Sequence, residues 1–160
     1  MALLPRLRRF ALALTGRAND ADDLVQDTVE RALRNLDRFV PDTRMDSWLF
    51  RIARNLWIDT TRSRNVRKTS DLSEAETVPH DGARAAEAHL LLSQTLGALA
   101  QLPEEQRNVV ALVLIDGLSY REAASVLEVP IGTVTSRLAR ARDALSLRVF
   151  GHAAGTETLQ

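Results

Sequence analysis

The sequence predicts an all-α protein of two small helical domains joined by an acidic flexible linker, with a helix-turn-helix in the second domain. Apolar residues recur at the helical spacing in both halves, and no stretch alternates apolar and polar residues as a half-buried strand does. The helical period lapses between about residues 63 and 83, where Ser, Thr, Pro and Gly stand among acidic residues. Since a structureless stretch of roughly 20 residues is unusual inside one compact domain, the domain boundary falls there. We therefore expect domains over residues 1–66 and 87–150, a linker over 67–86, and a disordered tail over 151–160.

Two helices open the first domain. Apolar residues follow the helical period from Leu3 to Leu14, and Gly16 is expected to end this helix. Asn19 or Asp20 then caps a second helix, because short polar side chains at this position accept a hydrogen bond from the first turn. The stripe that we expect this helix to bury comprises Leu24, Val25, Val29, Ala32, Leu33 and Leu36.

A loop and a third helix complete the first domain. Pro41 marks a loop over residues 37–44, and the third helix is expected over about residues 46–62. Its expected buried stripe comprises Trp48, Leu49, Ile52, Ala53 and Leu56. A cationic run closes the helix and comprises Arg62, Arg64, Arg67 and Lys68. Such a run is harder to explain as ordinary solvated surface than a single Arg would be.

The second domain is expected to hold four helices. Apolar residues from Ala88 to Leu99 mark the first of them. Pro103 starts the next, since proline suits a first helical position, and Gly117 ends it.

The last two helices form the strongest local motif. Ser119 and Glu122 make a capping box that opens a short helix, and a turn over residues 128–130 leads to a final helix over about 132–149. Two helices joined by a short turn, the second rich in Arg, indicate a helix-turn-helix that reads the DNA major groove. An ordinary αα-hairpin with a solvated outer face is the alternative, and the pattern alone leaves both open. The expected buried stripe of the last helix comprises Val134, Leu138, Ala141 and Leu145.

One residue in the turn departs from the usual pattern. Glu128 stands where such turns often carry Gly, and a left-handed non-Gly residue costs on the order of 1 kcal/mol. On the helix that follows, the wheel points Ser136, Ala139, Arg140 and Asp143 away from the buried stripe.

Charge divides the chain into three parts although the 21 cationic and 21 anionic side chains cancel overall. Residues 1–69 carry 14 cations and 9 anions, residues 70–106 carry one cation and seven anions, and residues 107–160 carry six and five. Twenty of the cations are Arg, which binds phosphate and guanine edges through paired donors.

Composition excludes several classes of protein. The chain has no Cys, so we expect no disulfide framework, thiol nucleophile or Cys-ligated metal. Its histidines, His80, His89 and His152, lack a plausible catalytic partner, and no Gly-rich phosphate loop occurs, so we expect neither catalysis nor a cofactor. No apolar run approaches 18 residues and the N-terminus does not read as a signal peptide. We expect a cytoplasmic protein without direct membrane insertion.

Four motifs in order around the acidic linker resemble one family. Residues 20–33, 47–59, 102–110 and 117–142 are similar to the matching segments of bacterial sigma-70 proteins of the extracytoplasmic-function type, group 4. The resemblance implies a transcription initiation factor that binds core RNA polymerase and promoter DNA and is held by an anti-sigma factor, in the cytoplasm or at the membrane.

The resemblance also implies three sets of site residues. It assigns core polymerase binding to Asp23, Gln26, Asp27 and Arg31. It assigns recognition and melting of the −10 element to Asp42, Thr43, Arg44, Arg51, Arg54, Asn55, Trp57 and Arg62. It assigns reading of the −35 element to Thr133, Ser136, Arg137 and Arg140.

Several of these residues also fit a purely structural role. The acidic residues of the polymerase set complement a helix N-terminus, Trp48 fits a core better than a stacking platform, and Trp57 fits either. A sigma-like mimic that titrates an anti-sigma factor and a stand-alone helix-turn-helix repressor are the alternative functions. Because the linker is acidic and the whole chain neutral, we also expect the linker to fold back on the basic parts, so that the free chain binds promoter duplex poorly.

Overall fold

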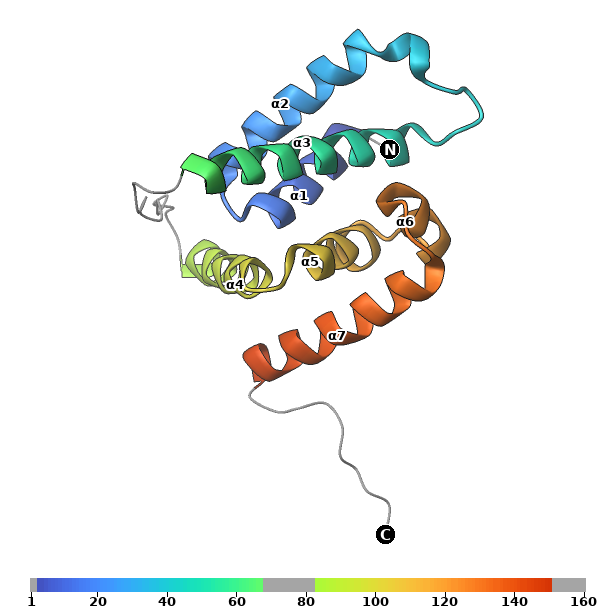
Figure 1. Ribbon diagram of the computed structural model, residues 1–160. Helices are drawn as coiled ribbons and strands as arrows, with labels where there is room; N and C mark the ends of the chain where they lie inside the picture. The colour runs from blue at the N-terminus through green and yellow to red at the C-terminus, as the bar shows by residue number, and fades with distance from the viewer. Residues whose placement is uncertain (1–2, 68–82, 151–160) are drawn as a thin grey trace.

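All regular structure is helical in the computed structural model, which describes residues 3–67 and 83–150 (Figure 1). The helices form two groups, a first domain of residues 3–67 and a second domain of residues 83–150, which lie one against the other. The expected linker centre and the tail lie outside the described residues. The elements are α1 Leu3–Thr15, α2 Ala18–Arg34, η1 Leu36–Arg38, α3 Met45–Arg67, α4 Ala83–Ala100, α5 Glu104–Val110, η2 Ala111–Ile115, α6 Tyr120–Leu127 and α7 Ile131–Phe150.

A tight connection joins α1 to α2. Gly16 ends α1 with a φ of 72°, as the sequence predicted, since glycine adopts this left-handed conformation without a Cβ clash. The predicted cap of α2 at Asn19 or Asp20 is wrong, because α2 begins at Ala18 with extended Arg17 before it. The Thr15 hydroxyl closes the turn instead and donates to the Arg17 carbonyl at 3.1 Å.

The three long helices of the first domain pack around a pair of phenylalanines. The rings of Phe10 and Phe50 lie 4.9 Å apart between centroids, and both residues are almost fully buried. The expected burial of Leu33 and Leu36 is wrong, since these residues are 67% and 53% exposed. The end of α2 and the following η1 lead away from the second domain, so nothing there covers the two leucines (Figure 1).

Helix α3 is longer and more broadly buried than its sequence indicated. It continues to Arg67, five residues beyond the expected end. Phe50 and Trp57 are buried although neither belonged to the expected stripe, whereas Trp48 is only half-buried and packs its ring on Phe39. The reason is that α3 contacts α1 and α2 on one side and α6 of the second domain on the other.

The second domain begins earlier than the sequence indicated. Helix α4 starts at Ala83, so residues 83–86, which we expected in the linker, are helical. Three alanines among residues 83–86 favour a helix through their high intrinsic propensity.

A π turn interrupts the expected second helix of this domain. The segment after Pro103 forms α5 and then the π turn η2, where the Asp116 amide donates to the Ala111 carbonyl at 3.1 Å. The predicted stop at Gly117 is confirmed by its φ of 75°.

The helix-turn-helix forms as predicted. In the capping box, the Glu122 amide donates to the Ser119 hydroxyl at 3.2 Å, and the Ser119 amide donates to the Glu122 carboxylate at 2.8 Å. Glu128 adopts the left-handed conformation, with a φ of 57°. Helix α7 then buries Val134, Leu138 and Ala141.

The two domains share an apolar interior. Helix α1 packs on α4, α5 and η2, and the buried apolar residues of both domains form one cluster. Arg107 stabilises this contact from the second domain. It donates to the carbonyls of Leu99, Ala100 and Leu102 near the end of α4 and to Leu14 of α1, each at 3.0 Å. Burial lowers the pKa of Arg107, and the carbonyls at the helix ends offset the loss of water around its charge.

Candidate nucleic-acid interface

Helix α7 presents two of the predicted −35 residues to solvent. Ser136 and Arg140 are exposed, on the face opposite the buried stripe, as the helical wheel predicted. Thr133 and Arg137 are half-buried, and Arg137 is turned toward α5, with its Nη2 3.0 Å from the Glu105 carboxylate. The structure therefore places four predicted residues on one helix but leaves only two of them fully open.

The loop before α3 is also exposed. Its Asp42 and Thr43 lie on the surface, and the Thr43 hydroxyl and amide both donate to Val40, at 2.6 and 2.9 Å, so the loop is folded into a turn. Asn55 and Arg62 are exposed farther along α3.

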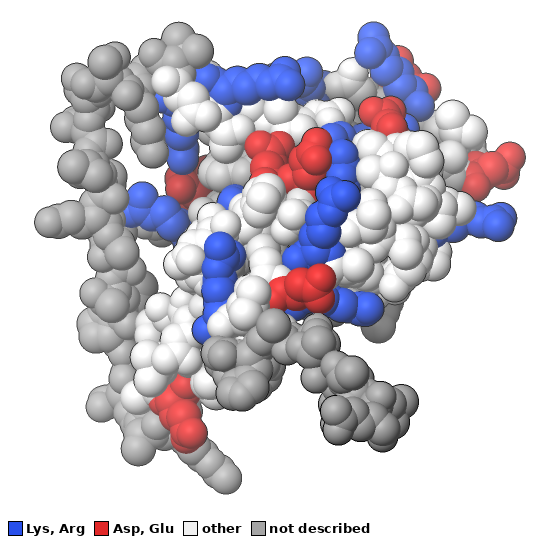
Figure 2. All heavy atoms as spheres, turned by 60° about the horizontal axis from the view of Figure 1, so that its bottom comes forward, with Lys and Arg blue, Asp and Glu red and all other residues white. Residues whose placement is uncertain are grey.

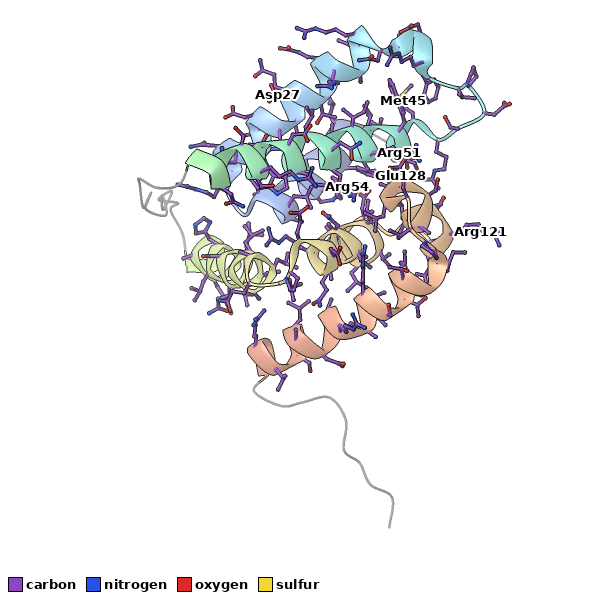
Figure 3. The ribbon with its side chains drawn as sticks, in the orientation of Figure 1. Asp27, Met45, Arg51, Arg54, Arg121 and Glu128 are labelled. Atoms are coloured by element: carbon purple, nitrogen blue, oxygen red, sulfur yellow. The ribbon has the colours of Figure 1, made fainter. Side chains whose placement is uncertain are left out.

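Two of the predicted −10 arginines contact the second domain. Figure 3 shows Arg51 of α3 beside Glu128 at the end of α6. Arg51 donates from Nη2 to the Ser125 carbonyl at 2.7 Å, and its Nη1 lies 3.8 Å from the Glu128 carboxylate. Arg44 donates to Glu122 of α6 and, at 2.6 Å, to Asp46 in the first turn of α3.

A polar cleft of about 430 Å³ lies between the domains next to these contacts. Residues of both predicted DNA-binding sets line it together with acidic residues of the second domain. The charged lining residues are Arg54, Arg62, Arg137, Glu104, Glu105 and Glu128. The Asn108 Oδ1 atom and the Arg54 Nε atom are buried and make no hydrogen bond to any described residue.

Trp57 lies in the interior in this conformation. It is 8% exposed, and the Arg64 guanidinium stands 5.7 Å from its ring centroid. Arg64 also binds Asp20 of α2, at 3.0 Å. The structure therefore packs Trp57 into the core and does not offer its ring to a base.

The predicted polymerase-binding residues share the outer surface of α2. Asp23, Gln26, Asp27 and Arg31 are all exposed. Figure 3 shows Asp27 on the side of α2 that faces away from the second domain. The core side of the same helix carries Ala21, Leu24 and Thr28, which are buried.

A three-residue ionic bridge at the domain contact was not predicted. Arg6 of α1 donates one hydrogen bond to Asp46, at 2.6 Å, and two to Asp116, at 3.2 and 3.1 Å. The Asp116 side chain is fully buried and that of Asp46 is 6% exposed. Burial disfavours the ionised form of Asp46, but hydrogen bonds from Arg44 and Arg6 lower its pKa to about 2. No sequence signal marked this bridge, because Arg6 and Asp116 stand 110 residues apart.

Basic and acidic side chains adjoin on the surface. On the face drawn in Figure 2, arginines stand next to aspartates and glutamates rather than gathering in one basic patch. A duplex approaching this face in this conformation meets compensated charge, which weakens the release of counterions that drives nonspecific DNA binding.

Comparison with known proteins identifies the family of this chain. Two families match the chain, one on each domain: Sigma-70 region 2 over residues 1–67 and Sigma-70 region 4 over residues 92–145. The ECF RNA polymerase sigma factor EcfG of Rhodopseudomonas palustris is 40% identical over 151 residues, covering 94% of this chain and 82% of that relative. The chain belongs to the extracytoplasmic-function sigma factors. The resemblance seen in the sequence is thereby confirmed.

Solved sigma factors have a similar arrangement of domains. The sigma factor RpoE of Bartonella quintana, solved with the anti-sigma factor NepR, matches with a TM-score of 0.78 and 33% identity over 92% of this chain and 91% of that one. CnrH, solved with the cytosolic domain of CnrY, matches with a TM-score of 0.67 and 32% identity over 89% of this chain and 79% of that one. The similarity spans both domains of this sigma factor, which is a transcription initiation factor by family.

The sequence predicts a chain that does not insert directly into a membrane, and the length and hydropathy of the helices can be compared with this prediction. Among the described residues, no helix is both long and apolar enough to cross a lipid bilayer.

Proposed function

We propose that this sigma factor directs core RNA polymerase to one class of promoter, with α7 reading the −35 element and α3 with its preceding loop reading the −10 element. The observation that carries the proposal is the exposed face of α7 in a complete helix-turn-helix. Ser136 and Arg140 project from this face, and an arginine there can reach base edges in the major groove.

Polymerase binding is assigned to the outer surface of α2. The exposed side chains of Asp23, Gln26, Asp27 and Arg31 lie at spacings of three and four, so they share one polar surface beside the buried stripe. A partner can bind this surface without opening the core. Polymerase supplies the chemistry in this proposal, and this chain catalyses no reaction itself.

Control by an anti-sigma factor completes the proposal. Two of the similar sigma factors were solved with anti-sigma factors, NepR and the cytosolic domain of CnrY. We extend such a partner to this chain, which it would hold inactive in the cytoplasm or at the membrane until a signal releases it.

Run-off transcription tests the proposal. Transcript starts would first be mapped after overproduction of the chain, and the promoter found would then be transcribed with core polymerase of Rhodopseudomonas palustris. A transcript is expected only when both proteins are present. Tight sequence-specific binding of the free chain without any transcript would favour a stand-alone repressor, and anti-sigma binding without a transcript would favour a mimic.

The polymerase surface has its own test. Gln26→Ala combined with Asp27→Arg should weaken binding to core polymerase without changing helicity, because both side chains are exposed. Asp59→Ala is the control, since Asp59 is exposed on α3 of the same domain and belongs to none of the assigned sets. Equal affinity of the double variant and the control would remove this surface from the interface.

A further inference from the structure

We propose that α6 covers part of the −10-reading surface in the free chain, at Arg44 and Arg51, so that the sigma factor rests in a closed form that promoter DNA must displace. We call the contact the clasp and define it as Arg44 and Arg51 of the first domain with Glu122, Ser125 and Glu128 of the second. The inference rests on the proposed function, because that function assigns the two arginines to the −10 element.

The clasp uses the groups that a DNA backbone would otherwise use. The clasp partners stand at the donors of Arg44 and Arg51. Arg44 donates to the Glu122 carboxylate, Arg51 donates to the Ser125 carbonyl at 2.7 Å, and the Glu128 carboxylate forms an ion pair with Arg51 at 3.8 Å. Guanidinium donors bind phosphate oxygens with the same geometry with which they bind carboxylates. Carboxylates on these arginines and a DNA strand on them are therefore mutually exclusive.

The clasp gives Glu128 a role that the helix-turn-helix itself does not. Glu128 has a φ of 57°, a left-handed conformation that disfavours residues with a Cβ. A glycine would satisfy the turn without strain, but it would leave Arg51 without a carboxylate across the domain contact.

The neighbouring cleft repeats the arrangement. Arg54 and Arg137 come from the two DNA-binding sets, and they line it together with Glu104 and Glu128. In the closed form, arginines of both sets thus line the cleft together with acidic groups of the chain's own second domain. The sequence suggested that the acidic linker compensates the charge of the DNA-binding arginines. Acidic residues of the described second domain already lie beside these arginines.

The exposure of the clasp residues favours opening of the closed form. The side chains of Arg44 and Glu122 are 54% and 29% exposed, and those of Arg51 and Glu128 are 40% and 62% exposed. Ion pairs at such exposure contribute modestly and weaken with salt. The Nε atoms of Arg51 and Arg54 are buried without a partner among the described residues, so release to water or DNA gives them a hydrogen bond.

A distance measurement on the free full-length chain tests the clasp. The sequence has no cysteine, so spin labels can be placed uniquely at Asp37→Cys and Arg121→Cys, which are exposed on different domains. Figure 3 shows Arg121 pointing outward from α6, away from α3. Pulsed electron resonance then reports the separation of the domains.

The clasp variant combines Glu122→Gln with Glu128→Gln. Glutamine at residue 122 keeps the capping box, so the helix should remain intact while the charges are lost. The matched control combines Glu87→Gln with Asp143→Asn, which removes two exposed carboxylates from the same domain outside the clasp. Glu128→Gly is a further variant that removes the ion pair with Arg51 and relieves the turn, so it weakens the clasp without endangering the fold.

Removing the clasp charges should raise the ratio of open to closed molecules about three- to thirty-fold, and added salt should have the same effect on the unmodified chain. Both clasp variants, but not the control, should also bind a single-stranded oligo(dT) probe more tightly. Equal distance distributions in all proteins, or an equal gain in oligo(dT) affinity in the control, would overturn the clasp. Run-off transcription with core polymerase reports separately on the proposed function, so a failure of the clasp can be told from a failure of that function.

Discussion

Loss of Arg6 should destabilise the contact between the domains. Its guanidinium binds Asp46 at 2.6 Å and Asp116 at 3.1 Å, and the three side chains are 15%, 6% and 0% exposed. Breaking a buried pair by removing one partner costs about 3–5 kcal/mol, because the remaining charge stays buried.

The structure sets the expected loss near the lower end of that range. After Arg6→Gln, Asp116 keeps the Arg9 guanidinium at 3.6 Å, and Asp46 keeps Arg44 at 2.6 Å. Neither carboxylate is left wholly uncompensated, so we expect a loss of about 3 kcal/mol in the free energy of unfolding. In urea, this loss corresponds to a midpoint about 1–2 M lower, given typical slopes for domains of this size.

Urea unfolding followed by circular dichroism measures the effect, and Arg8→Gln is the control. Arg8 lies on the same helix, but its pair with Asp22 is exposed, at 52% and 54%, so its loss should leave the midpoint unchanged. The double variant Arg6→Gln with Asp116→Asn should recover part of the stability, because it leaves no carboxylate at residue 116. Equal midpoints for Arg6→Gln and Arg8→Gln would refute the reasoning.

Three further predictions concern local groups. Asp46 has a pKa of about 2 in the folded chain, below that of an unfolded Asp, so it should contribute about 2 kcal/mol of stability above about pH 4. This stability should be lost as the pH falls toward 2. Urea midpoints measured against pH should show the loss for the wild type but not for Asp46→Asn. Ser119→Ala removes the acceptor of the Glu122 amide and should destabilise the helix-turn-helix by about 1 kcal/mol, seen as a lower melting temperature; an unchanged melting curve would contradict the cap. Arg140→Ala should reduce transcription from the native promoter by the equivalent of about 1–3 kcal/mol if Arg140 contacts a base, whereas Arg148→Ala, which changes an exposed residue at the end of the same helix, should not.

Local signals in the sequence predicted most of the helices correctly. Gly16 and Gly117 end helices with positive φ values, and Ser119 with Glu122 forms the expected capping box. Each of these signals acts between residues at most a few positions apart, so the neighbouring sequence is enough to specify it. The exposure of Ser136 and Arg140 was predictable for the same reason, since helical periodicity alone assigns them to the outer face.

The domain contact could not be predicted from local patterns. Arg6 and Asp116 lie 110 residues apart, and Arg44 and Glu122 lie 78 apart. The capping box already accounts for Glu122, so nothing in the sequence indicated a second partner for its carboxylate. The burial of Trp57 likewise depends on how neighbouring helices cover α3, which the periodicity of α3 does not contain.

The π turn at Ala111–Ile115 has a consequence for comparing sequences. A π turn holds one residue more than an α-helical turn, so it marks the place where a helix has gained a residue without losing its continuity. Because the π turn takes up this extra residue within a single turn, deleting one residue there would restore a regular α-helical turn and leave the orientation of the following residues nearly unchanged. Asp116 would then keep its position opposite Arg6, although it would stand one residue earlier in the chain. A one-residue gap over residues 111–115 in an aligned relative is thus compatible with the same carboxylate at the domain contact.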